Sequence, residues 1–336
     1  VDNTATLTQA AEMRLMHTIH PDAEKVLRDI HADIWNLCNN HIMDAGQDGL
    51  ALTLQEAKKF GAKTIGVGMN MTEAARPLIL DEAGGIGLFA VGYQRGCKPA
   101  GEDKGGCLSW SEMEIIRSTI QEIKTKCRWC VVVAHGGEEF TAIPSPYTRD
   151  RYHAYLEMGA DLVVCHHPHV PMNYETVGDK MIFYSLGNFI FDTDYQRAQF
   201  NTEKGILLKL HFTEDRYSFE AFGLKINREN EHIESAPLPK IFVDIQEDDY
   251  NKLEPLAAKM FLAATKRQQL FLYPDKFKNA TEAQWKAHFY EEKRSGRVPG
   301  EALDFQIIYP IAQEEAKGAW KECKLEAVKA YILEQM

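Results

Sequence analysis

Three histidines occur within four residues of DLVVCHHPHV, the stretch that spans residues 161–170. The apolar, β-branched residues before them predict a buried strand, so the histidines lie at its carboxyl end. On an extended backbone His167 and His169 share one face, and Pro168 between them keeps the chain out of a helix. Two imidazoles on one face can bind a divalent transition metal, whereas His166 points the other way or begins the next loop.

Polar residues also follow two other apolar stretches. In VVVAHGGEEF, His135 ends a predicted strand, and a Gly-Gly turn separates it from Glu139. In NLCNNHIMDAG, the adjacent pair Asn40 and His41 follows a short strand and precedes Asp44. Taken alone, the first histidine is equally a capped or core residue, and the second stretch is equally a loop rich in turn formers.

A fourth stretch, YSLGNFIFD, interrupts an apolar pattern with Ser185, Gly187 and Asn188. It predicts either a glycine bulge or a backbone segment that packs closely under a site. Because a doubly wound sheet brings successive carboxyl ends to one edge, the four stretches can converge. Their donors are nitrogen and oxygen atoms without thiolates, a set that suits Zn²⁺, Mn²⁺ or Fe, and two ions can be held if carboxylates contribute.

The elements that position these residues alternate between two periodicities. Helical spacing predicts helices over residues 21–30, 49–62, 111–126 and 149–160, and apolar runs predict strands over residues 32–37, 63–69, 86–93, 130–135, 161–169, 179–192, 205–212 and 217–227. This alternation indicates βαβ units and an α/β (α+β) fold. Gly61 is expected to end the second helix, and Ser109 or Ser111 to cap the third.

The character of the chain changes near residue 246, where strongly helical patterns with charged faces begin. We therefore expect one domain over residues 1–245 and a helical C-terminal extension over residues 246–336. The formal net charge of −11 argues against nucleic-acid binding, which usually needs a basic face. No run approaches the roughly 18 apolar residues of a membrane helix, so no membrane segment is expected in this chain.

The N-terminal residues have no signal-peptide character, and the cellular location is left open. A leader or anchor removed before residue 1 would place the protein outside the cytoplasm, at the cell envelope. Seven cysteines make an odd count, which argues against a disulfide scaffold. Cys127 and Cys130 form a C-x-x-C pair that we interpret as packing. A thiol redox site is the alternative, and it would require exposed thiols of low pKa.

Four blocks of the chain resemble the signature blocks of the CapA family in order and spacing. These blocks are NLCNNHIMDAGQDGL, VVVAHGGEEF, GADLVVCHHPHV and IFYSLGNFIFD, and the resemblance covers about residues 20–225. It implies a fold like that of the calcineurin-like metallophosphoesterases, with sheets flanked by helices. It also implies a part in capsule or poly-γ-glutamate synthesis.

The resemblance implies roles for individual residues. The implied metal ligands are Asn40, His135, His167 and His169. His41 or His166 would protonate a leaving group or hold developing charge, and Glu139 joins this catalytic set, where it and Asp44 would orient a histidine. The chain departs from the family at Gly136, where a Trp is usual, and at Cys165, where a Gly is usual. The Gly-Asp and Asn-Leu-Glu blocks that supply carboxylates in the family are not found before residue 20.

We therefore expect a metal-dependent hydrolase or transferase that acts on a phosphoester or a γ-glutamyl polymer, with one or two ions of Mn, Zn or Fe. The alternative is a non-catalytic assembly or binding subunit of an envelope-polymer export machine, which the missing carboxylate blocks favour. The expected partners are an anionic polymer or phosphoester substrate and envelope-synthesis proteins. Because the chain itself is acidic, Arg149 and Arg151 are candidates for binding such a polymer.

Overall fold

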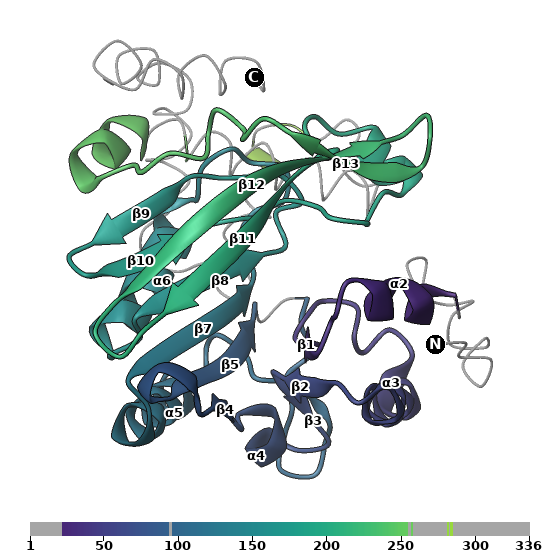
Figure 1. Ribbon diagram of the computed structural model, residues 1–336, viewed down its shortest axis with the longest axis vertical. Coiled ribbons are helices and arrows are strands. Elements are labelled where there is room, and N and C mark those ends of the chain that lie inside the picture. Colours follow the sequence, from purple (N-terminus) through teal and green to yellow (C-terminus); the bar gives the residue numbers. More distant parts are fainter. Residues whose placement is uncertain (1–21, 94–95, 255–256, 258–280, 282, 285–336) are drawn as a thin grey trace. The chain divides into compact units, whose positions relative to one another are not determined.

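The computed structural model describes residues 22–93 and 96–254, together with residues 257, 281, 283 and 284 (Figure 1). The contacts within the chain divide it into two compact units. The first takes in described residues of the segments Val1–His135, Tyr155–Val163 and Phe212–Arg216, and the second takes in those of Gly136–Ala154, Val164–His211 and Tyr217–Met336. Helices and strands occur in both units, so the predicted mixed α/β class is confirmed.

The first unit is built around a parallel pair of strands. β5 (Ile86–Gly92) pairs in parallel with β7 (Trp129–His135), and β4 (Leu78–Leu80) pairs antiparallel with β5. The beginning of β8 (Leu162–His166) lies next to β7. Two smaller sheets complete the unit, the parallel pair β1 (Ile34–Asn36) and β2 (Lys63–Ile65) and the antiparallel pair β3 (Val67–Gly68) and β6 (Gly106–Cys107).

Amphipathic helices cover these sheets. On α5 (Met113–Lys126), Ile116, Ile120 and Ile123 recur at helical spacing and are fully buried, and Ile123 packs against Gly87 of β5. On α3 (Gly46–Phe60) the predicted stop is confirmed, because Gly61 caps the helix with φ 90°. The shorter helices of this unit are α2 (Ala23–Asp29), α4 (Met71–Ala74) and the 3₁₀ turn η2 (Glu82–Gly84).

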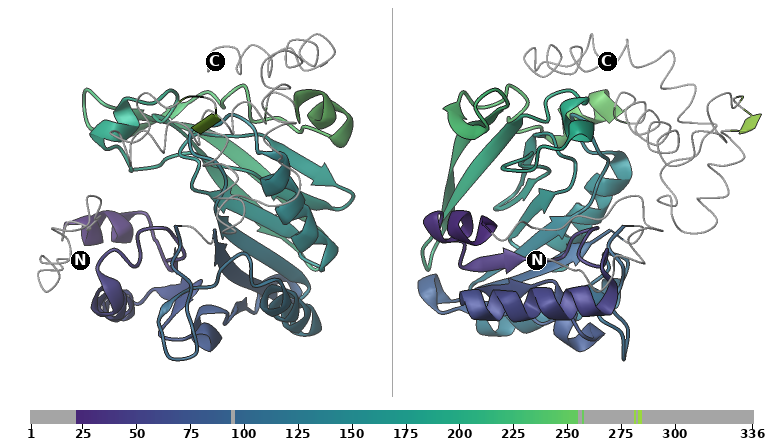
Figure 2. Two further views of the ribbon diagram at one scale, coloured as in Figure 1. Left: turned by 180° about the vertical axis from the view of Figure 1, so that it is seen from behind. Right: turned by 90° about the vertical axis from the view of Figure 1, so that its right-hand side faces the viewer.

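The second unit is layered. The end of β8 is followed in its sheet by β10 (Lys180–Phe183) and β9 (Tyr174–Val177), and a separate antiparallel sheet contains β11 (Lys204–Phe212), β12 (Tyr217–Asn227) and β13 (His232–Ala236) (Figures 1 and 2). An aromatic cluster joins the two sheets, because Phe219 of β12 contacts Tyr174 and Phe183 at ring-centroid distances of 5.3 and 5.1 Å. This unit also contains α7 (Asp194–Arg197) and the first part of α6 (Pro146–Glu157).

Some predicted elements differ from the structure at their ends. Neither Ser109 nor Ser111 caps α5, which follows Glu112, because the two hydroxyl groups hydrogen-bond to each other at 2.7 Å. β1 is shorter than residues 32–37, and none of its residues is buried. β10 ends at Phe183 and α7 follows, so the strand predicted over residues 179–192 is too long. Apolar runs predict burial here, and they do not distinguish a strand from a buried loop.

The predicted C-terminal extension over residues 246–336 lies almost entirely outside the described residues. Residues 247–254 are helical, as predicted, and Tyr250 donates a hydrogen bond to the carbonyl of Pro144 at 2.9 Å. Among the described residues, no helix has the length and apolar character that a membrane crossing requires.

Candidate metal centre

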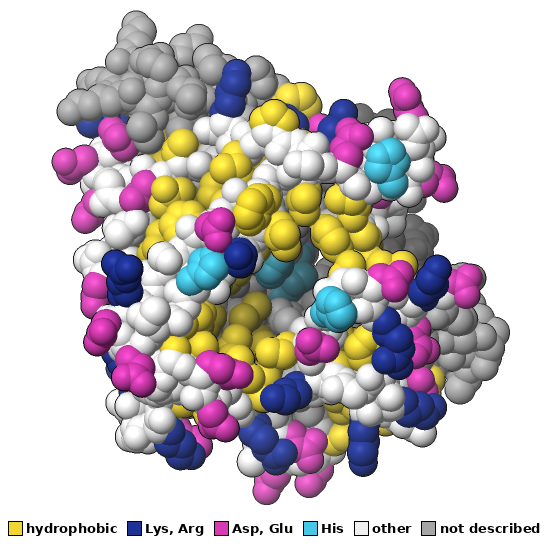
Figure 3. Space-filling model, in the orientation of Figure 1, with side chains coloured by type: hydrophobic (Ala, Val, Ile, Leu, Met, Phe, Trp, Pro, Cys, Tyr) yellow, Lys and Arg dark blue, Asp and Glu magenta, His cyan; other side chains and the backbone are white. Residues whose placement is uncertain are grey.

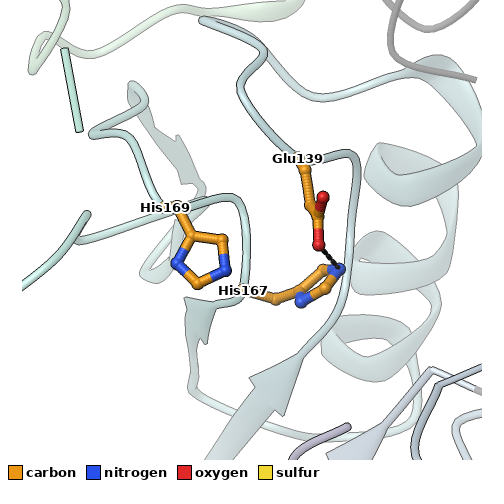
Figure 4. Close-up of side chains that lie close together, drawn as sticks. All are labelled: Glu139, His167 and His169. Carbon is orange, nitrogen blue, oxygen red and sulfur yellow. Dashed lines mark ion pairs between the residues drawn. The ribbon is translucent and has the colours of Figure 1, made fainter. Parts of the chain in front are cut away.

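Glu139, His167 and His169 converge in the second unit (Figure 4). Each offers one ligand atom, and these atoms all lie within 4.8 Å of one another. His167 is buried, and its Nε2 atom is 3.9 Å from a carboxylate oxygen of Glu139. We call these three residues the metal triad, because two imidazoles and a carboxylate form a set that binds divalent transition metals.

Backbone hydrogen bonds bring the two chain segments of the metal triad together. The amide of Gly136 donates to the carbonyl of His166 at 3.0 Å, and the amide of Phe140 donates to that of Pro168 at 2.8 Å. The loop that carries Glu139 is therefore joined at both ends to the histidine segment. These bonds position the triad through the main chain, independently of the side chains that form it.

The backbone conformation that brings His167 and His169 together differs from the extended strand that the sequence predicts. β8 ends at His166, so His167 and His169 do not alternate along a strand. Their φ angles are 107° and 62°, and that of Phe140 on the facing loop is 62°. Residues other than glycine seldom adopt positive φ, so the turn is strained where it aims the two imidazoles.

The buried carboxylate of Glu138 stabilises the loop next to the metal triad. The side chain of Glu138 accepts hydrogen bonds from the hydroxyl groups of Ser145 and Thr148 at 2.7 and 3.0 Å, and from the amide of Ser145 at 3.2 Å. Burial raises the pKa of Glu138, and these hydrogen bonds lower it in part. Glu138 therefore joins the loop to the beginning of α6.

His166 ends β8 and precedes the triad histidines. Burial lowers the pKa of His166 to about 4, so its imidazole is neutral at pH 7. A neutral imidazole keeps one N–H donor and one acceptor nitrogen. Its carbonyl accepts the bond from Gly136 described above, which makes His166 part of the junction between the two segments.

A second group of predicted site residues lies in the first unit, at the end of β7 and in the loop after β1. Asp44 accepts a hydrogen bond from His41 Nδ1 at 2.8 Å, and His41 Nε2 accepts one from the side-chain amide of Asn40 at 3.1 Å. The amide oxygen of Asn40 lies 2.9 Å from Nε2 of His135. A separation of this size is compatible with two ligands of one ion, and with the hydrogen bond that the two atoms can form.

The predicted site residues thus form two sets, each within its own unit. His167 and His169 occur together with Glu139, whereas Asn40 and His41 occur together with His135. The sequence predicts an orienting role for Glu139 and does not place it among the metal ligands. A feature of the sequence could have indicated that Glu139 is a candidate ligand, because an acidic residue after a Gly-Gly turn can fold back toward the end of a strand.

Other predicted features have structural explanations. Arg149 is buried and binds both carboxylate oxygens of Glu175, so it is not an exposed residue that could bind an anionic polymer. Arg151 donates to the hydroxyl of Tyr147 at 2.6 Å. Cys127 and Cys130 are both buried, and burial raises the pKa of Cys127, which argues against the alternative of a thiol redox pair.

Comparison with known proteins gives the family. The family model described as bacterial capsule synthesis protein PGA_cap matches residues 3–193, more than half of the chain. The chain belongs to the PGA_cap family. The matched segment of this PGA_cap chain contains the metal triad and the Asn40 and His135 set.

Two curated relatives illustrate the similarity. The PGA biosynthesis protein CapA of Bacillus subtilis is 32% identical over 182 residues, which cover 53% of this chain and 47% of that protein. The capsule biosynthesis protein CapA of Bacillus anthracis is 27% identical over 214 residues, which cover 62% of this chain and 51% of that protein. The aligned part of this PGA_cap chain spans about half the length of these relatives.

Proposed function

We propose that this PGA_cap protein acts in poly-γ-glutamate capsule synthesis as a divalent-metal-dependent hydrolase or transferase with a fold of the calcineurin-like metallophosphoesterase type. The observation that carries the proposal is the convergence of Glu139, His167 and His169. Membership of the PGA_cap family and the names of its Bacillus relatives support the capsule context. The substrate class is a phosphoester or a γ-glutamyl polymer.

The donor chemistry of the metal triad fits Zn²⁺, Mn²⁺ or Fe. Two imidazoles and one carboxylate leave coordination positions for water and substrate, as in catalytic rather than structural metal sites. The absence of thiolates from the triad also distinguishes it from a structural zinc site of the Cys₄ type. Asn40 and His135, which lie in the first unit, are proposed as a separate pair of ligands, so the proposal allows one or two ions.

A divalent ion held by the metal triad would polarise a substrate oxygen and lower the pKa of a bound water toward about 7. The protein's own groups supply the remaining steps. In the first unit His41 is the proposed catalytic group, and Asp44 fixes the orientation of its ring through Nδ1. His166, neutral at pH 7, is proposed to donate a hydrogen bond to the developing charge. Glu139 and the two triad histidines would hold the ion.

The test combines metal analysis with turnover. The purified chain is stripped with a chelator, reloaded with Mn²⁺ or Zn²⁺, and assayed for metal content and for hydrolysis of a generic phosphodiester and of poly-γ-glutamate. The single substitution His167→Ala is expected to lower bound metal and to reduce turnover at least a hundredfold, because it removes one of three ligands. His232→Ala is a matched control, since His232 is an exposed residue of β13 outside the triad.

Equal metal content and turnover in His167→Ala and the unsubstituted protein would refute the enzyme proposal. Metal binding without turnover on either substrate would instead favour the alternative, a non-catalytic assembly or binding subunit of an envelope-polymer export machine. One feature of the triad favours that alternative, because Glu139 is its single carboxylate. In either case the proposed partners are envelope-synthesis proteins.

A further inference from the structure

Asn188 lies next to the metal triad, and its amide group has a defined orientation. The side chain is buried, and its nitrogen atom Nδ2 lies 3.0 Å from the backbone carbonyl of Thr202 and 3.2 Å from the side-chain oxygen of Gln196. A backbone carbonyl can only accept a hydrogen bond, so the atom that faces it must be the amide nitrogen. The amide oxygen therefore faces the other way, where Nδ1 of His169 lies 2.9 Å from it.

This orientation determines which nitrogen of His169 carries the proton. An amide oxygen has no hydrogen to give, so the hydrogen bond requires Nδ1 of His169 to be the donor. A neutral imidazole has a single N–H, and its other nitrogen, Nε2, then keeps the lone pair that a metal needs. We propose that Asn188 is a positioning residue that holds His169 in the Nδ1–H tautomer and so presents Nε2 to the divalent metal of the triad.

Neighbouring groups restrict the positions of Asn188 and His169. The backbone of Asn188 is anchored opposite Gly205, where an added Cβ would lie 2.0 Å from the Asn188 carbonyl oxygen. The ring of His169 is stacked against Phe140 and Phe191, with centroid distances of 5.8 and 5.1 Å and interplanar angles of 24° and 19°. The aromatic rings restrict the plane of the imidazole, and the hydrogen bond to Asn188 selects its rotation within that plane.

The assignment rests on the proposed metal site, so its first test needs no metal. Histidine labelled with ¹⁵N is incorporated into the metal-free protein, and a long-range ¹H–¹⁵N spectrum at pH 8 identifies the tautomer of each ring. The His169 signal is assigned by its absence from His169→Ala. We expect the Nδ1–H tautomer in the unsubstituted protein and its loss in Asn188→Leu, which has no acceptor.

The second test measures affinity for Zn²⁺ by calorimetry. Partners that orient a metal-binding histidine typically change metal affinity ten- to a hundredfold, so Asn188→Leu should bind Zn²⁺ more weakly by that factor. The matched control is Asn173→Leu. Asn173 has a buried side-chain amide in the same unit, and this amide donates a hydrogen bond to the carbonyl of Tyr174. Its substitution should leave the tautomer of His169 and the affinity for Zn²⁺ unchanged.

An Nε2–H tautomer of His169 in the unsubstituted, metal-free protein would overturn the proposal without any variant having to fold. Equal affinity of Asn188→Leu and the unsubstituted protein would also overturn it. Failure of the proposed function looks different, because it would appear as normal Zn²⁺ binding and the expected tautomer without turnover. If the unsubstituted protein binds neither Zn²⁺ nor Mn²⁺, the metal role of Asn188 is overturned together with the metal site.

Discussion

The substitution Glu175→Gln tests the charged network in the interior of the second unit. Glu175 is a buried residue of β9 that accepts hydrogen bonds from Arg149, from Tyr184 and from His153. Burial by itself raises the pKa of Glu175, but the hydrogen bonds and the charge of Arg149 outweigh it and lower the pKa from 4.5 to about 2. The carboxylate is thus more stable in the folded protein than in the unfolded chain.

The contribution of Glu175 to folding stability follows from this pKa shift. A fall in pKa from 4.5 to about 2 corresponds to about 3 kcal/mol of folding stability. Because the folded-state pKa of Glu175 is depressed, this contribution is complete above pH 4.5 and is lost as the pH falls toward 2. Glu175→Gln should therefore cost about 3 kcal/mol at pH 7, where it leaves Arg149 buried without its counter-charge, and only about 1 kcal/mol at pH 3.

Urea unfolding monitored by circular dichroism at several pH values between 7 and 3 measures this difference. The control is Glu220→Gln, which removes the carboxylate of an exposed ion pair with His211 on the neighbouring strand. Exposed pairs are screened by solvent, so the control should change stability far less. A Glu175→Gln difference that stays constant from pH 7 to pH 3, or that equals the control, would refute the account of this network.

Two further substitutions test the first unit. Ile120→Ala on α5 should lower the free energy of unfolding by about 2–4 kcal/mol, because Ile120 is fully buried and its removal leaves a cavity, whereas Ile190→Ala at an exposed position should have little effect in the same urea titration. Gly61→Ala should cost about 1 kcal/mol, because the cap of α3 requires φ 90°. Gly101→Ala is its control, since no positive φ is required there, and an equal loss at both glycines would contradict the explanation.

The regular elements could be predicted because their patterns are local. The spacing of Ile116, Ile120 and Ile123 defines the buried face of α5, and the apolar run before His135 defines β7. The ends of elements were less predictable, because they depend on partners that are distant in sequence. β8 ends at His166 because the next residue, His167, has a positive φ of 107°, which no local pattern indicates.

The site was predictable in its residues and not in its geometry. The cluster HHPH indicated that His167 and His169 lie close together, as they do, although the positive φ angles of both were not foreseen. The role of Asn188 was not foreseen either, because its interpretation as part of a tight backbone segment says nothing about its amide. Hydrogen-bond partners such as Thr202 decide the orientation of that amide, and they become visible only in three dimensions.

The strain around the metal triad bears on whether the triad is functional. Phe140, His167 and His169 all have positive φ, a conformation that costs non-glycine residues of order 1–3 kcal/mol each. Glycine at these positions would avoid the cost, and a turn with a purely structural role has no need of an imidazole there. The chain instead places imidazoles at two of the strained positions and an aromatic ring that stacks on His169 at the third. The chain thus keeps imidazoles at two positions where glycine would be unstrained, which supports the proposal that these side chains have a functional role.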